Sequence, residues 1–202
     1  MEAEIDKVAF PRLHAYWREL PQGLASHPGC LSKASIYRKL LEIRPVDRSR
    51  GALPAALVDL IERPAPIGAW VPTTLVNAIE LAVADSCGSD SAFVEVAHRM
   101  NRDLLRSPMY SAMFALLSPT TMLKVATSVW SRFHQGTKLH VAFAEKSATV
   151  VLTFPPLLHP KLILLEKGTA YQSAVEVAGA KDIACRLAEV SDRHAQFRVR
   201  WS

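Results

Sequence analysis

The side chains that could do acid–base, nucleophilic or metal chemistry are scattered along this chain. His134 and His140 stand six residues apart, across the end of an expected helix and the start of an expected strand. The acids stand singly on expected helices, where solvation or an i,i+4 ion pair such as Glu95 with Arg99 is the ordinary explanation. An enzyme needs convergent groups, and the sequence contains no HExxH, GxSxG, phosphate-loop or GxGxxG motif. We therefore predict that the protein is not an enzyme.

The cysteines, Cys30, Cys87 and Cys185, are widely spaced and form no CxxC pair. Neither a disulfide framework nor a zinc site is indicated by this spacing. A single inward thiol such as Cys185 is typical of core packing, because the cysteine side chain behaves as a small hydrophobic group. We predict reduced thiols, no bound metal and no cofactor.

The bulk properties bound the class of protein. A content of 50% hydrophobic residues in a chain of 202 excludes intrinsic disorder. The formal net charge is +5, but the densest basic run, Arg44–Arg50, is typical of a solvated loop. No zinc-finger spacing or RNA-binding aromatic motif occurs, so no nucleic-acid partner is expected.

The sequence shows neither a membrane-spanning segment nor a signal peptide. No apolar run approaches the about 20 residues that a spanning helix needs. Met1–Lys7 is acidic and polar, unlike the basic and apolar start of a signal peptide. We expect a cytoplasmic protein without a membrane span.

The last third of the chain predicts two β-hairpins around a helix. Apolar and polar residues alternate with period 2 in Thr137–Glu145 and Ala148–Phe154, and again in Lys181–Glu189 and Arg193–Trp201. Between the hairpins, Pro160–Ala178 has helix-forming composition and is followed by a glycine, which commonly ends helices. The bulky apolar residues of the strands share one side. We predict one antiparallel four-stranded sheet with the helix against that side.

The preceding part of the chain is predicted to be helical. Helical spacing of apolar residues, with proline and glycine stops, indicates helices at 35–43, 52–62, 72–87, 90–106, 108–117 and 118–134. Residues 1–30 predict an irregular N-terminal segment with one short helix. The expected fold class is α+β in a single domain, 1–202, in which a helical bundle, 31–135, packs on a ββαββ part, 136–202.

The outward face of the expected sheet is a candidate interaction surface. Its cationic or ionisable side chains stand next to several alanines. Alanine is a poor former of exposed strands, so its presence here indicates that another chain or a ligand could approach this face closely. These side chains are His140, Arg186, Arg198 and Arg200. Guanidinium groups offer bidentate contacts to carboxylate or phosphate. An ordinary solvated or self-covered face is the alternative.

A set of aromatic side chains is a candidate ligand pocket. Its members are Trp70, Tyr110, Trp130 and Phe133. They either line an apolar pocket between helices and sheet or fill the core, since aromatic residues at helical spacing usually pack.

Short motifs stand at the boundaries of the expected elements. They are Trp70-Val71-Pro72, Ser118-Pro119, Trp130 with Phe133, Gly136, Gly179 and a final strand ending in Trp201. In this order they resemble a bacterial family of unknown function that is expanded in myxobacteria, and the match spans about residues 30–202.

The same layout is similar to a wider group of sensors of small or hydrophobic ligands, the 4-vinyl-reductase and haem nitric-oxide-binding domains. In the former, cysteines flank the last hairpin, whereas Val190–Phe197 contains none. In the haem binders a helical histidine ligates the iron and a Tyr-x-Ser-x-Arg motif clamps the propionates. Here His98 sits mid-helix but the motif is absent. We therefore expect neither haem nor zinc.

These observations predict a non-catalytic ligand-sensing or protein-interaction module in bacterial signalling or regulation. An enzyme of unknown reaction that acts on a hydrophobic small molecule is the alternative. The expected partner is a protein or a small hydrophobic or anionic ligand, whose identity the sequence does not give. Assembly as a homodimer is left open.

Overall fold

The computed structural model describes residues 5–108, 110–111 and 118–202. The chain forms two compact units, Met1–Val96 and Ala97–Ser202, and the boundary falls within helix α5 (Asp90–Leu105). The predicted α+β class is confirmed. The single domain over residues 1–202 stays a prediction. No helix among the described residues is long and apolar enough to cross a membrane.

The first unit is mainly helical. Its elements before α5 are α1 (Pro11–Glu19), β1 (Pro21–Leu24), β2 (Leu31–Lys33), α2 (Ala34–Ile43), the 3₁₀ turn η1 (Arg48–Arg50), α3 (Ala55–Glu62), β3 (Trp70–Pro72) and α4 (Thr73–Ser86). Strands β2 and β3 pair antiparallel, with Ser32 opposite Val71. The sequence prediction missed these strands, because three residues are too few to show an alternation.

Helix α4 is the centre of the first unit. It begins directly after Pro72, and most of its apolar side chains, including Val76, Ile79 and Val83, are almost completely buried. Helices α1, α2 and α3 all contact it. A helix that is apolar on most sides is expected to be enclosed in this way.

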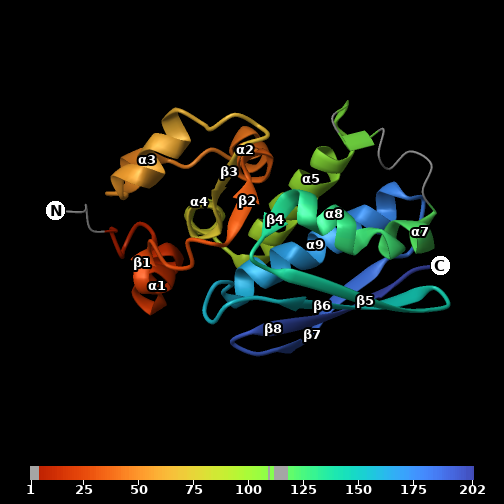
Figure 1. The fold of residues 1–202 in the computed structure, drawn as a ribbon. Helices are drawn as coiled ribbons and strands as arrows, with labels where there is room; N and C mark the ends of the chain where they lie inside the picture. The colour runs from red at the N-terminus through yellow and green to blue at the C-terminus, as the bar shows by residue number, and fades with distance from the viewer. Residues whose placement is uncertain (1–4, 109, 112–117) are drawn as a thin grey trace. The chain divides into compact units, whose positions relative to one another are not determined.

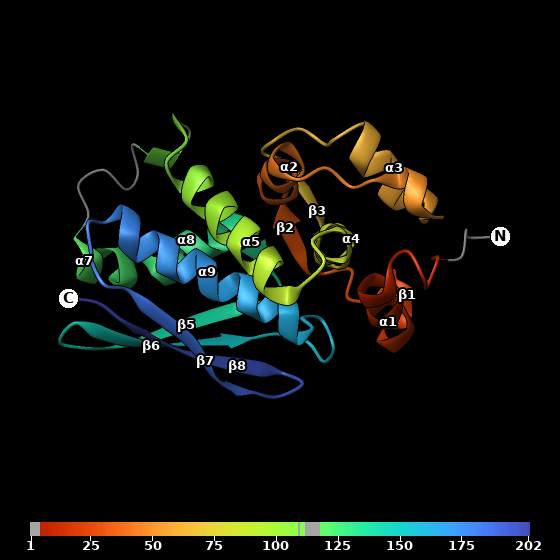
Figure 2. The same ribbon diagram turned by 180° about the vertical axis from the view of Figure 1, so that it is seen from behind.

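The second unit is a sheet with helices on one face (Figures 1 and 2). After α5 its described elements are α7 (Pro119–Lys124), α8 (Ala126–Phe133), β4 (His134–Gln135), β5 (Lys138–Ala144), β6 (Ser147–Thr153), α9 (Lys161–Val177), β7 (Ala184–Val190) and β8 (His194–Arg200). The helix predicted over 118–134 is interrupted at Val125 and forms α7 and α8. Most of the helix predicted over 108–117 lies outside the described residues.

The four-stranded antiparallel sheet is confirmed, with the order β5-β6-β8-β7. Val141, Val150, Phe197 and Leu187 lie side by side across it. Helix α9 packs against this apolar row, since a Cβ at Gly168 would lie 3.5 Å from the ring of Phe197. Helices α7 and α8 contact β5 on the same side (Figure 1).

The sequence prediction needs correction at two places in the sheet. Phe143, expected to face inward, is 40% exposed, because it lies at the end of edge strand β5 beside the turn to β6. Strand β7 begins at Ala184, not at Lys181. Asp182 has a φ of 47°, a left-handed conformation that does not continue a strand. The predicted helix end is correct: Gly179 follows α9 with a φ of 91°.

Candidate functional site

The predicted aromatic candidates do not all come together. Tyr110 and Phe133 pack with ring centroids 4.8 Å apart, and Trp130 stacks on His134 with centroids 4.0 Å apart. Trp70 belongs to the first unit, where the Nζ of Lys33 lies 3.8 Å from its ring centroid. These contacts are packing contacts between side chains, and a ligand pocket at the aromatic residues stays a prediction.

The interior of the second unit holds a polar cluster that the sequence reasoning missed. On α9, Lys167 Nζ lies 2.6 Å from Glu166 Oε2, and both side chains are almost completely buried. Asn101 on α5 donates from Nδ2 to Glu166 Oε1 and to Thr169 Oγ1, each at 3.0 Å. Two adjacent charged residues on a helix normally indicate a solvated surface, so no sequence signal pointed to this buried pair.

A buried tyrosine and a half-buried cysteine lie beside the apolar face of the sheet. The ring of Tyr171 packs edge-on against Phe197 at 5.0 Å, and its hydroxyl has no hydrogen-bond partner among the described residues. Burial raises the pKa of Tyr171 well above its ordinary value. Burial also raises the pKa of the Cys185 thiol to about 12, so the thiolate that reacts as a nucleophile is disfavoured.

The histidine on α5 is engaged by a carboxylate. His98 Nε2 lies 3.2 Å from Glu176 Oε2 on α9. Arg102 and Arg106 approach the other oxygen of Glu176 at 3.8 and 3.6 Å. Ser173 completes the contact between the helices by donating to the carbonyl of His98 at 3.4 Å. His98 thus contributes to helix packing.

The outward side of the sheet carries what we call the arginine face, formed by Arg186, Arg198 and Arg200. Arg186 on β7 stands directly opposite Arg198 on β8, and Arg200 is flanked by Ala184 on β7 and by Ser147 on β6. The three side chains are exposed. Within the described part of the chain, none of the three guanidinium groups has an ion-pair or hydrogen-bond partner. The fourth predicted residue, His140, is exposed on β5, opposite Val151.

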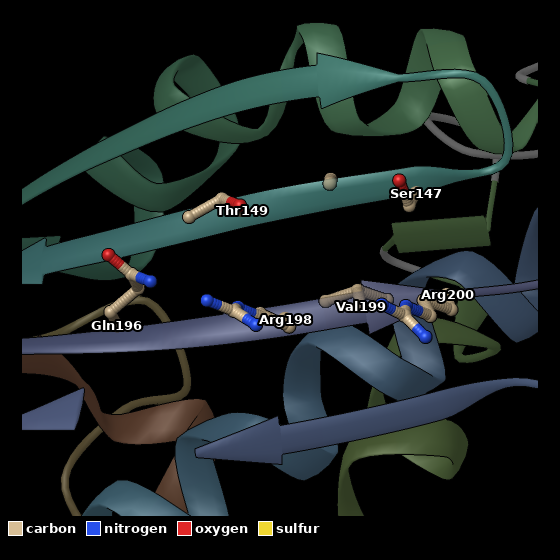
Figure 3. Close-up of a pocket in the computed structure, with 7 residues that line it drawn as sticks. Ser147, Thr149, Gln196, Arg198, Val199 and Arg200 are labelled. Carbon is tan, nitrogen blue, oxygen red and sulfur yellow. The ribbon is translucent and has the colours of Figure 1, made fainter. Parts of the chain in front are cut away.

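A hollow with a volume of about 270 Å³ opens on the arginine face (Figure 3). It is lined by Ser147, Ala148, Thr149, Gln196, Arg198, Val199 and Arg200. The side chains of Ser147 and Thr149 come from β6, and the arginines come from the neighbouring β8 (Figure 3). The sequence reasoning named Arg198 and Arg200 but not the β6 hydroxyl groups. Ser147 and Thr149 alternate with the inward apolar residues of β6, and this period-2 spacing could have predicted that their hydroxyl groups lie on the outward side.

Comparison with known proteins shows the fold. No protein-family model matches the chain, and no curated protein does. Solved structures of H-NOX domains match. An oxygen-binding H-NOX domain related to soluble guanylate cyclases has 13% identity and a TM-score of 0.57, over 83% of this chain and 91% of its own. A structure on the mechanism of H-NOX activation has 11% identity and a TM-score of 0.54. The match covers 84% of this chain and 96% of the H-NOX chain.

A mutant H-NOX domain from T. tengcongensis has 12% identity and a TM-score of 0.50, and the match covers 96% of this chain and 97% of the H-NOX chain. Identities this low establish a shared fold alone. The H-NOX likeness agrees with the resemblance to haem nitric-oxide-binding domains seen in the sequence. The resemblances to a myxobacterial family and to 4-vinyl-reductase domains stay predictions.

The residues present do not fit the haem that the fold implies. Haem iron is held by a ring nitrogen of a histidine. Nε2 of His98, the mid-helix histidine, already faces Glu176 at 3.2 Å, so ligation through this nitrogen would have to break that contact. The segment closest to the propionate clamp is Tyr171-Gln172-Ser173-Ala174-Val175 on α9, in which a fully buried valine stands at the position of the arginine. Among the described residues no three His, Cys, Asp or Glu side chains are grouped to hold a metal ion.

Proposed function

We propose that this chain is a non-catalytic recognition module that uses an H-NOX-like fold without haem, and that its recognition surface is the arginine face. The neighbouring structures include an oxygen-binding domain related to soluble guanylate cyclases, so this fold binds a small ligand there. The observation that supports our proposal most directly is the hollow of about 270 Å³ beside the unpaired guanidinium groups of Arg198 and Arg200.

The charge on this face favours recognition over a structural role. A surface arginine that serves the fold can pair with a carboxylate of another element, as Arg12 does with Asp90 in the first unit. Two carboxylates of this region, Glu189 on β7 and Asp182 just before β7, are engaged elsewhere. Glu189 lies 3.2 Å from His194 Nε2, and Asp182 accepts a hydrogen bond from Ser202 Oγ at 2.8 Å. The guanidinium groups of the face are therefore available to a ligand or a partner.

Native mass spectrometry of the gently purified chain tests this function. We expect a co-purifying molecule on the wild-type protein, and we expect its loss when Arg198 and Arg200 are both changed to glutamate. The matched control is Arg132→Glu on the exposed surface of α8, which should retain the molecule. Far-ultraviolet circular dichroism establishes that the double variant is folded. A molecule retained by the folded double variant would show that recognition lies elsewhere.

Absorbance spectroscopy tests the haem-free part of the proposal. The purified chain, incubated with hemin and desalted, should show no stoichiometric Soret band, because Nε2 of His98 contacts Glu176 and the arginine of the propionate clamp is replaced by Val175. A Soret band that disappears in His98→Ala would contradict the proposal.

A further inference from the structure

We infer that the arginine face binds a small molecule that carries a phosphate group, with the phosphate seated between Arg198, Arg200 and the hydroxyl groups of β6. The inference rests on the proposed function and deepens it by naming the class of ligand.

Charge repulsion is built into the face. Arg186 and Arg198 are direct cross-strand partners, and Arg200 lies two residues further along β8 on the same side. Like charges placed directly opposite each other in a sheet are destabilising. Nothing in the described residues neutralises them. A fold that keeps such a local conflict commonly does so at a functional site, where a bound anion relieves the repulsion.

The donor set suits phosphate better than a carboxylate. A carboxylate has two oxygens and one negative charge, whereas a phosphate monoester has three terminal oxygens and carries close to two negative charges. Arg198 and Arg200 line the hollow together with Ser147 and Thr149, whose hydroxyl groups are additional neutral donors (Figure 3). Gln196 adds an amide at the other end of the hollow. This set provides more donors than one carboxylate accepts.

The neighbouring side chains are small on both sides of the hollow. Ala184 stands opposite Arg200, and Ala142 and Ala144 on β5 stand opposite Thr149 and Ser147. A volume of about 270 Å³ holds a phosphate with a compact organic group. Drug-sized ligands occupy clefts of about 300–1,000 Å³, so the hollow is matched to a small metabolite.

Nuclear magnetic resonance titration of the whole ¹⁵N-labelled chain with inorganic phosphate tests the inference. We expect saturable shifts at the amides of residues 147–149 and 196–200, and no matching shifts with sodium chloride at equal ionic strength. Acetate should bind at least about tenfold more weakly, a difference of about 1.4 kcal/mol. Arg198→Gln and Arg200→Gln should each weaken phosphate binding by about tenfold, and Arg132→Gln should not change it.

Several results would overturn the inference. They are phosphate shifts no larger than chloride shifts, acetate binding as tightly as phosphate, and equal weakening by Arg132→Gln. A phosphoserine peptide that binds more than about tenfold tighter than inorganic phosphate would overturn the small-molecule assignment. The proposed function fails separately, in the mass-spectrometry experiment. A molecule lost from the folded glutamate double variant without any phosphate binding would leave the surface correct and the ligand class wrong.

A second measurement does not depend on binding. In low salt without added anion, Arg186→Gln should keep or raise the melting temperature, because it removes the repulsion with Arg198 across the β7–β8 ladder. Added phosphate should then raise the melting temperature of the wild type more than that of Arg186→Gln. A fall in the melting temperature of Arg186→Gln without anion would show that the pair is not in conflict.

Discussion

Asp85, at the end of α4, holds the first turn of α1 through Arg12. One oxygen of Asp85 accepts hydrogen bonds from the backbone N–H of Arg12 at 3.1 Å and from its Nη1 at 3.2 Å. The other oxygen accepts the N–H of Leu13 at 3.2 Å. The residue before α1, Phe10, has no side chain that can cap the helix. The carboxylate from α4 therefore satisfies donors that the N-terminus of α1 leaves open.

Replacing Asp85 by alanine should destabilise the first unit strongly. The change leaves two helix N–H groups without an acceptor and removes a carboxylate whose side chain is fully buried. We expect the free energy of unfolding to fall by about 2–3 kcal/mol. Urea unfolding followed by circular dichroism measures it. The control Asp59→Ala removes an exposed i,i+4 partner of Arg63 and should cost less than about 0.5 kcal/mol. Equal losses in the two variants would contradict the capping role.

Replacing Lys167 by methionine should be more costly than replacing an exposed lysine. The carboxylate of Glu166 would stay buried without its ion-pair partner, at an expected cost of about 3–5 kcal/mol in chemical denaturation. The double variant Glu166→Gln with Lys167→Met should recover most of this loss, since no charge is then buried. Lys39→Met, which breaks the half-exposed pair with Glu42, should cost less than about 1 kcal/mol. A double variant no more stable than the single one would be the contrary result.

Replacing Tyr171 by phenylalanine should leave stability unchanged or raise it. The change deletes a buried hydroxyl that has no hydrogen-bond partner in the described residues and keeps the ring contact with Phe197. The expected gain in the free energy of unfolding is up to about 1 kcal/mol. Tyr37→Phe is the matched comparison, because the Tyr37 hydroxyl oxygen accepts the N–H of Ala65 at 2.7 Å; its loss should cost about 1 kcal/mol. A lower melting temperature for Tyr171→Phe would mean that its hydroxyl has a partner.

The second unit should lose stability as the pH falls below about 6.5, the ordinary pKa of histidine. Burial, followed by the nearby charges of Lys167 and His159, lowers the pKa of His134 well below 6.5 in the folded state. As the pH falls, the unfolded chain therefore takes up the proton first, and the free energy of unfolding falls with it between the unfolded and the folded pKa. Urea titrations at pH 7.5 to 5 should show this slope reduced in His134→Phe. His140→Gln, at an exposed position, should keep the full slope; an unchanged slope in His134→Phe would refute the assignment.

Local pattern was sufficient to predict much of this fold. The strands β5, β6 and β8, the helices α2, α3, α4, α5 and α9, and the glycine at the end of α9 follow from period-2 and period-3.6 spacing. The same alternation placed Arg198 and Arg200 on the outward side of β8, because successive side chains of a strand point to opposite faces. Both properties are local, so a single sequence carries them.

Contacts between distant segments were decided by the tertiary structure. Arg12 and Asp85 are 73 positions apart, and no spacing rule links a helix start to a carboxylate that far along the chain. The register of β7 against β8, which sets Arg186 opposite Arg198, includes a shift between Leu187 and Glu189 that alternation cannot show. Glu166 and Lys167 are buried because α9 is enclosed on several sides, whereas adjacent charges in a sequence normally indicate a solvated helix. The local sequence determines on which face of a strand or helix a side chain lies, and tertiary packing determines which distant residues or solvent that face contacts.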